Sequence, residues 1–452
     1  MSTHSHPLPL HERKVYGHPA GLYVLFFTEL WERFSYYGMR ALFTLFLVAE
    51  TTSENAGFGW TNEEALWLYG WYTMLVYIAS IPGGWIADNL LGQKNTVMLG
   101  GALLCIGHAV LALDSETSFY IGCLFVILGV GCLKPNISSM VGGLYKKGDE
   151  KRDLGFYIFY MGINIGGFTA PLLCGWVGET FNWHYGFGLA AIGMLLGQVV
   201  YIYGQKYLVG VGDFIGKADN PDRELRKKKL TAIEKDRVKV LILSFLMIIV
   251  FWGAFEQAGG LMNLYAEQKT DRMLLGWEIP ASWFQSLNSF FIITLAVVIG
   301  GFWYRWKMKG KESSSLFKIA IGILIMSIGF LFMRFAASEY ELFGKSAMYW
   351  LVLAYLFHTI GELCSSPVSL SFITKLAPVK YGASIMGLYW AATGLGNKLA
   401  ASVGGWAQTA GEKEIFTGIF IFCAIIAILV LLILKPLKRL THGAEDLEKS
   451  TQ

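Results

Sequence analysis

Hydrophobic residues run in long stretches along this chain, separated by short polar segments. An α-helix needs about 20 consecutive apolar residues to cross a bilayer. We therefore predict an all-α, polytopic membrane protein with twelve membrane-spanning helices. The predicted spans cover residues 22–48, 63–87, 95–113, 118–143, 154–178, 186–207, 238–265, 282–305, 317–337, 346–374, 383–408 and 415–435.

A polar segment between the sixth and seventh spans divides them into two sets of six. Two six-helix halves are typical of secondary transporters, whose substrate site lies between the halves near the middle of the membrane. We predict a cytoplasmic tail at 1–21, a six-helix bundle at 22–207, a cytoplasmic linker at 208–237, a second six-helix bundle at 238–435 and a cytoplasmic tail at 436–452.

Lysine and arginine are concentrated in alternate loops. The segment 206–239 is rich in them, whereas 49–62 and 179–185 contain none. By the positive-inside rule this alternation places both termini in the cytoplasm. With 54% hydrophobic residues the chain is not a soluble protein, so its environment is the lipid bilayer and nucleic acid is not an expected partner.

The six cysteines lie in apolar stretches and show no spacing typical of metal ligands. We therefore expect no metal and no cofactor, apart from protons as a coupling ion if the protein is a transporter.

The first predicted span carries four charged residues. Glu29 and Arg33 are spaced i,i+4, which predicts an ion pair within one helix. Each charge near the bilayer centre costs about 2.5–3.5 kcal/mol on insertion scales, so this face must point into the protein or a wet cavity. The face could lock helices together or form a functional site. It consists of Glu29, Glu32, Arg33, Tyr36, Tyr37 and Arg40.

Further ionisable residues lie in other spans, and their signs differ between the two halves. The first half holds Lys134 with Arg40, and the second half holds Glu256 and Glu362. A lysine near a helix end can extend to the membrane surface. Lys134 lies well inside its span, however, and the helix-disrupting Pro135 follows it. A cavity with one positive and one negative wall suits a zwitterion such as a short peptide. Arg40–Glu256 and Lys134–Glu362 pairs would form contacts that protonation breaks.

Several of these segments together resemble the proton-dependent oligopeptide transporter (POT) family, a branch of the major facilitator superfamily, in its bacterial members. The resembling segments are Glu29-x-x-Glu32-Arg33-Phe34-x-Tyr36-Tyr37-Gly38, Gly83–Gly92, Lys134-Pro135, Phe156–Gly166 and Gly361-Glu362. The resemblance implies the major facilitator fold and a proton-coupled symporter that imports di- and tripeptides by alternating access. Compact loops and the absence of appended domains predict the bacterial inner membrane. We further expect a monomer that is not an enzyme.

The resemblance further implies roles for individual residues. It assigns proton coupling to Glu29, Glu32, Arg33 and Glu256. It assigns substrate binding to Tyr37, Arg40, Tyr77, Lys134, Asn164, Asn288, Glu362 and Ser366, and places Tyr389 and Trp390 beside a pocket for peptide side chains. The peptide carboxylate would meet the basic residues, and the amino group would meet Glu362 with Asn288. By itself, Asn164 is equally suited to a hydrogen bond between helices.

The chain departs from the family pattern at three positions. Phe255 replaces the first of two adjacent acids in the seventh span, and Tyr389 stands where a tryptophan is common. Gly70 occupies the position of a functional histidine in animal members, so no histidine proton switch is expected there. The segment 208–237 is too polar for the two additional helices of most bacterial members.

Two alternatives remain beside peptide import. The same fold could carry another substrate, such as a peptidomimetic drug, an amino-acid conjugate or nitrate. A membrane receptor or enzyme is the other alternative, but no nucleophile with a base is evident. His108 and His358 have no Cys, Asp or Glu at metal-ligand spacing.

Overall fold

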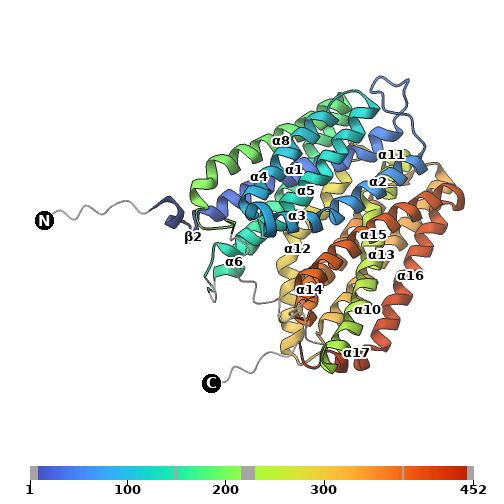
Figure 1. Cartoon of the computed structure of the whole chain (residues 1–452). Coiled ribbons are helices and arrows are strands. Elements are labelled where there is room, and N and C mark those ends of the chain that lie inside the picture. The colour runs from blue at the N-terminus through green and yellow to red at the C-terminus, as the bar shows by residue number, and fades with distance from the viewer. Residues whose placement is uncertain (1–8, 147–148, 150, 215–229, 379–380, 445–452) are drawn as a thin grey trace. The chain divides into compact units, whose positions relative to one another are not determined.

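The computed structural model describes residues 9–146, 149, 151–214, 230–378 and 381–444, without the side chains of 382–384. The described helices form two compact units (Figure 1). Unit 1 comprises the described residues of Met1–Leu42 and Ala79–Ala218, and unit 2 those of Phe43–Ile78 and Asp219–Gln452.

Unit 1 contains the first part of α1 and the described helices between residues 79 and 207. Its α-helices are α1 (Ala20–Val48, which continues into unit 2), α3 (Ser80–Ile86), α4 (Gly92–Leu111), α5 (Glu116–Gly143), α6 (Lys151–Ala170), α7 (Trp176–Thr180) and α8 (Trp183–Gly204). Single turns of other helix types are η1 (Leu10–Glu12), η2 (Ala87–Leu91), η3 (Pro171–Gly175) and η4 (Gln205–Tyr207). A hairpin of β1 (Lys14–Val15) and β2 (His18–Pro19) precedes α1.

Close backbone contacts hold unit 1 together where glycines face a neighbouring helix. A Cβ on Gly83 of α3 would lie 2.5 Å from the carbonyl carbon of Gly131 in α5, and a Cβ on Gly131 would lie 2.5 Å from Ala79 O. Glycine is therefore required on both sides of this contact. Small residues allow this approach, which drives helix association where no water is present.

Unit 2 contains the remaining helices. They are α2 (Asn62–Ile78), α10 (Ala232–Phe255), η5 (Glu256–Ala258), α11 (Leu261–Lys269), α12 (Trp283–Met308), α13 (Ser315–Phe343), α14 (Tyr349–Leu376), α15 (Gly382–Ala410), α16 (Glu412–Leu432) and α17 (Leu434–Leu440). Short strands pair as β3 (Thr270–Asp271) with β6 (Ser346–Ala347) and β4 (Met273–Leu274) with β5 (Trp277–Glu278). The second predicted span, α2, packs along α15. The predicted boundaries of two six-helix bundles stay a prediction.

The helices confirm an all-α, polytopic membrane protein. Nine stretches of the described residues are long and apolar enough to cross a membrane, and one of them, Asn62–Leu111, contains two predicted spans. The other two predicted spans correspond to α1 and α15, each of 29 residues. α1 carries four charged residues, Glu29, Glu32, Arg33 and Arg40, which lower its mean hydropathy.

The expectation that Pro135 disrupts its helix was wrong. α5 continues through Pro135, and α14 continues through Pro367. Neighbouring side chains and helices can satisfy the backbone around a proline in a membrane helix. Asn136 supports α5 locally, since its Nδ2 donates a 2.7 Å hydrogen bond to Cys132 O.

Candidate functional site

A buried charge cluster lies on α1. Glu29, Glu32 and Arg33 are each at most 4% exposed. Arg33 Nε lies 3.2 Å from Glu29 Oε1, which confirms the predicted i,i+4 ion pair. Arg33 also binds Glu32 through Nε and, at 2.6 Å, through Nη2 to Oε1. This fork of donors orients the guanidinium between two carboxylates.

One carboxylate oxygen of this cluster can accept a further hydrogen bond or a proton. Glu29 Oε2 is buried and accepts no hydrogen bond from the described residues. Lys134 of α5 interacts electrostatically with Glu29. Two helices therefore contribute to the cluster, in which Arg33 and Lys134 oppose the charges of Glu29 and Glu32. A buried polar atom without a partner is uncommon, so Oε2 is a place where a proton can bind.

Tyrosine rings extend the cluster along α1 towards Arg40. The Arg33 guanidinium carbon lies 5.2 Å from the centroid of the Tyr36 ring and 6.0 Å from that of Tyr37. The Arg40 guanidinium carbon lies 5.7 Å from the centroid of the Tyr37 ring. Tyr37 thus contacts both cations, and such cation–π contacts are stronger where water is excluded. Tyr37 and Arg40 are half-buried.

Asn164 lies on α6 and is buried. Its Nδ2 donates a 2.9 Å hydrogen bond to Tyr160 O, one turn earlier in the same helix. This bond is local, so it does not support the alternative of a hydrogen bond between helices.

In unit 2 the seventh predicted span is interrupted at Glu256. α10 ends at Phe255, the short turn η5 follows, and α11 begins at Leu261. Other helices bind the interrupted segment: Tyr355 Oη donates to Ala258 O at 3.1 Å, and Gln257 Nε2 donates to Ala400 O at 2.8 Å. Discontinuous helices are a common way for transporters to place polar groups at membrane depth.

The carboxylate of Glu256 binds a tyrosine of α2. Tyr69 Oη donates a 2.5 Å hydrogen bond to Glu256 Oε1, and both residues are buried. The pairing of Glu256 with Arg40 stays a prediction, and Tyr69 was not among the predicted site residues. Because Tyr69, Thr73 and Tyr77 follow one face of α2 at four-residue spacing, the helical period was the signal that could have found it.

A second carboxylate lies between α12 and α14. Asn288 Nδ2 donates to Glu362 Oε2 at 2.8 Å and to Thr359 Oγ1 at 3.2 Å. The structure therefore brings together the two residues that the family resemblance assigns to the peptide amino group. Thr359 was not predicted, although it precedes Glu362 by three residues and so shares its helix face.

Aromatic residues of α15 lie next to this carboxylate. Tyr389 is hydrogen-bonded to Ser369 and interacts electrostatically with Glu362. Trp390 stacks on Tyr77 of α2, with ring centroids 5.9 Å apart and an angle of 22° between the planes. Ser366, one turn after Glu362 on α14, is half-buried.

The predicted site residues thus form two groups, one in each unit. Unit 1 holds Glu29, Glu32, Arg33, Tyr37, Arg40, Lys134 and Asn164, and unit 2 holds Tyr77, Glu256, Asn288, Glu362, Ser366, Tyr389 and Trp390. The cations assigned to the substrate pocket, Arg40 and Lys134, lie in unit 1, and the acid assigned to it, Glu362, lies in unit 2 with Tyr69, Thr359 and Ser369. Their individual roles stay predictions.

Comparison with known proteins decides the family. A model described as "POT family" matches residues 94–212 and 215–416. This chain belongs to the POT family. Among its relatives, the peptide transporter YePEPT of Yersinia enterocolitica is 37% identical, with 96% of this chain and 97% of the relative covered. The di-/tripeptide transporter of Lactococcus lactis subsp. cremoris is 34% identical, with 95% and 98% covered.

Solved structures of the POT family share the fold. A crystal structure of a peptide transporter POT in complex with sulfate aligns with a TM-score of 0.89 at 33% identity and covers 96% of this chain and 98% of that chain. The chain is therefore a multi-pass membrane protein of a transporter family, with the major facilitator fold that the sequence predicted.

Proposed function

We propose that this POT-family chain is a proton-coupled symporter that imports di- and tripeptides by alternating access, and that it is not an enzyme. Its place is the bacterial inner membrane, as a monomer with both termini in the cytoplasm. Similarity to a peptide transporter and a di-/tripeptide transporter along nearly their whole lengths supports the substrate class.

The contact between Asn288 and Glu362 carries this proposal. A carboxylate held by an amide at 2.8 Å inside a membrane protein is oriented to receive a cation. In a peptide that cation is the terminal ammonium. The peptide carboxylate binds Arg40 and Lys134, the cations of unit 1 that the family resemblance assigns to the pocket. A zwitterion satisfies both groups at once, whereas a simple anion such as nitrate satisfies only the cations.

Protons act on the carboxylates that hold the cations. A proton on Glu29 or Glu32 weakens the attraction for Arg33, and a proton on Glu29 also weakens the attraction for Lys134. Protonation of Glu256 weakens its predicted pairing with Arg40. Lys134 and Arg40 are then available to the peptide carboxylate. Because the coupling free energy must come from different affinities in the two states, protonation and peptide binding favour the same state of the transporter.

Peptide-dependent proton flux in proteoliposomes tests the proposed function. The purified chain is reconstituted with a pH-sensitive dye inside the vesicles, and a dipeptide is added outside under an inward proton gradient. We expect acidification of the lumen that depends on the dipeptide and is absent from protein-free vesicles.

The same assay separates the alternatives. Nitrate, a peptidomimetic drug or an amino-acid conjugate that drives proton flux while dipeptides do not would indicate another cargo. A receptor would bind peptide in a thermal-shift assay and produce no flux with any of these compounds.

A further inference from the structure

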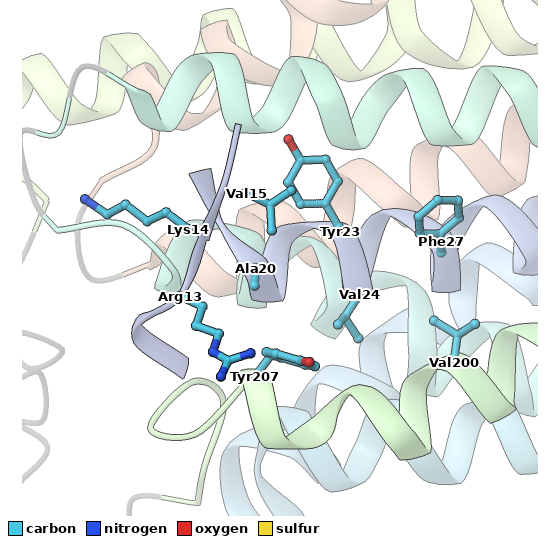
Figure 2. Close-up of a pocket in the computed structure, with 9 residues that line it drawn as sticks. All are labelled: Arg13, Lys14, Val15, Ala20, Tyr23, Val24, Phe27, Val200 and Tyr207. Carbon is cyan, nitrogen blue, oxygen red and sulfur yellow. The ribbon is translucent and has the colours of Figure 1, made fainter. Parts of the chain in front are cut away.

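A surface pocket of about 650 Å³ lies in unit 1 where the chain enters α1 (Figure 2). Its lining changes character along its length. Arg13 and Lys14 line one end, and Val24, Phe27 and Val200 line the other. The pocket is separate from the charge cluster on α1, and neither the family comparison nor the proposed transport mechanism assigns it a role.

The two cations at the pocket are exposed, and none of the described carboxylates forms an ion pair with them. The backbone holds them in place, because Ala20 N donates to Arg13 O at 2.9 Å and Lys14 pairs with Pro19 in the hairpin. Figure 2 shows that the Arg13 side chain runs towards Tyr207, while Lys14 extends away from the apolar side chains. The pocket therefore has two positively charged side chains at its rim, on a backbone that the hairpin holds in place.

The apolar end lies deeper along α1. A helix rises about 1.5 Å per residue, so Val24 and Phe27 lie roughly 6–10 Å beyond Ala20 along the axis. Phe27 is 46% exposed and Val200 is half-buried, so this end is an accessible apolar wall. Two tyrosines, Tyr23 and Tyr207, lie along the lining, as is common at the level of lipid headgroups.

We propose that this pocket binds one anionic phospholipid from the leaflet that the sequence predicts to be cytoplasmic. The lipid phosphate pairs with Arg13 and Lys14, and an acyl chain lies along Val24, Phe27 and Val200. This occupant matches both ends of the pocket. A soluble anion would use only the cationic rim and leave the apolar wall in contact with bulk lipid.

Native mass spectrometry of the full chain in detergent tests the proposal, with phosphatidylglycerol and phosphatidylcholine as probes. We expect one phosphatidylglycerol that resists removal and no equivalent phosphatidylcholine. Arg13→Gln with Lys14→Gln should weaken phosphatidylglycerol binding about 25-fold, roughly fivefold for each cation. The matched control, Lys307→Gln with Lys309→Gln, removes the same charge from the exposed end of α12 and the turn after it, and should retain the bound lipid.

A second variant tests the acyl half of the site. Val200→Trp fills the apolar end from α8, and we expect it to weaken phosphatidylglycerol binding at least fivefold while both cations remain. Equal unfolding temperatures of the variants without added lipid exclude a folding defect in the cation pair, whose side chains are exposed.

Three results would overturn the proposal. If glycerol phosphate or inorganic phosphate protects the protein against heat as well as phosphatidylglycerol does, the pocket binds a soluble anion. If the Lys307/Lys309 control loses the lipid equally, the attraction is a general effect of net charge. If phosphatidylcholine is retained as firmly, the cations do not select the ligand.

Discussion

Tyr69 Oη donates a 2.5 Å hydrogen bond to Glu256 Oε1, and so joins α2 to the interruption between α10 and α11. The two residues are 187 positions apart in the sequence. Glu256 is an acid of the proposed proton pathway. Its hydrogen bond from Tyr69 depends on its ionisation, because a carboxylate accepts such a bond more strongly than a neutral acid does.

Tyr69→Phe should therefore impair proton coupling. The variant removes one hydrogen-bond donor from a buried carboxylate oxygen, at a cost of about 1–3 kcal/mol. We expect gradient-driven dipeptide uptake to fall about fivefold or more, with a smaller effect on peptide counterflow, as for Glu256→Gln. The ratio of driven uptake to counterflow in proteoliposomes measures this difference.

Tyr265→Phe is the control for Tyr69→Phe. It removes another buried tyrosine hydroxyl of unit 2, which lies 3.2 Å from Ser346 Oγ and binds no carboxylate in the part of the chain that the structure describes. It should lower the unfolding temperature but leave the ratio of driven uptake to counterflow unchanged. If the two variants change that ratio equally, the Tyr69–Glu256 bond has no special part in coupling.

Glu362→Gln should weaken peptide binding through the amino terminus. A hydrogen bond to a charged group contributes about 1.5–3 kcal/mol, so the KM for a dipeptide should rise roughly 10- to 100-fold. An N-acetylated dipeptide lacks the ammonium group and should bind the wild type and the variant equally weakly. Competition against a labelled peptide in counterflow measures both, and Glu341→Gln, which breaks an exposed pair with Lys413, should leave affinity unchanged.

Lys134→Ala should weaken binding through the peptide carboxylate. Affinity for a free dipeptide should fall about 10-fold or more, and affinity for the C-terminally amidated dipeptide should change little. Lys413→Ala removes a half-buried lysine of α16 and serves as the control in the same counterflow assay. Wild-type transport by both Lys134→Ala and Glu362→Gln would contradict the proposed pocket.

Glu312 leads to a prediction about how the stability of the fold depends on pH. It lies between α12 and α13, where burial raises its pKa but hydrogen bonds from Lys438 and Ser314 outweigh that effect and lower the pKa to about 2. A lowered pKa stabilises the fold above the unfolded value of about 4.3, and the contribution is lost as the pH falls through about 2. Glu312 therefore stays ionised at pH 5.5 and at pH 8.0, and its contribution to the free energy of unfolding is the same at both values.

Glu312→Gln should lower the unfolding temperature by the same small amount at pH 5.5 and pH 8.0, roughly 1–3 °C. Both side chains of the pair are at least 36% exposed, so the free energy of unfolding should change by at most about 1 kcal/mol. Thermal unfolding in detergent measures it. A difference between the two pH values would show that Glu312 titrates in this range.

The sequence correctly predicted the membrane-spanning helices and the ion pair within α1. Glu29 and Arg33 pair because both lie on one helix face, and this follows from the helical period alone. The same local reasoning was wrong at Pro135, because α5 continues through it in contact with α3.

Contacts between helices could be found only in the tertiary structure. Asn288 and Glu362 are 74 positions apart, and their contact depends on how α12 packs against α14. The family resemblance named these two residues, but no sequence pattern named Tyr69 as the partner of Glu256.

The sequence by itself determined that this chain crosses the membrane as a bundle of helices with charges on the inner face of α1. Each helix satisfies its own backbone in lipid, so length and hydropathy are sufficient to identify it. Only the tertiary structure decided that α10 ends at Phe255 and that Tyr69 donates a hydrogen bond to Glu256 at this point. That outcome depends on side chains from separate helices packing together, which no local pattern encodes.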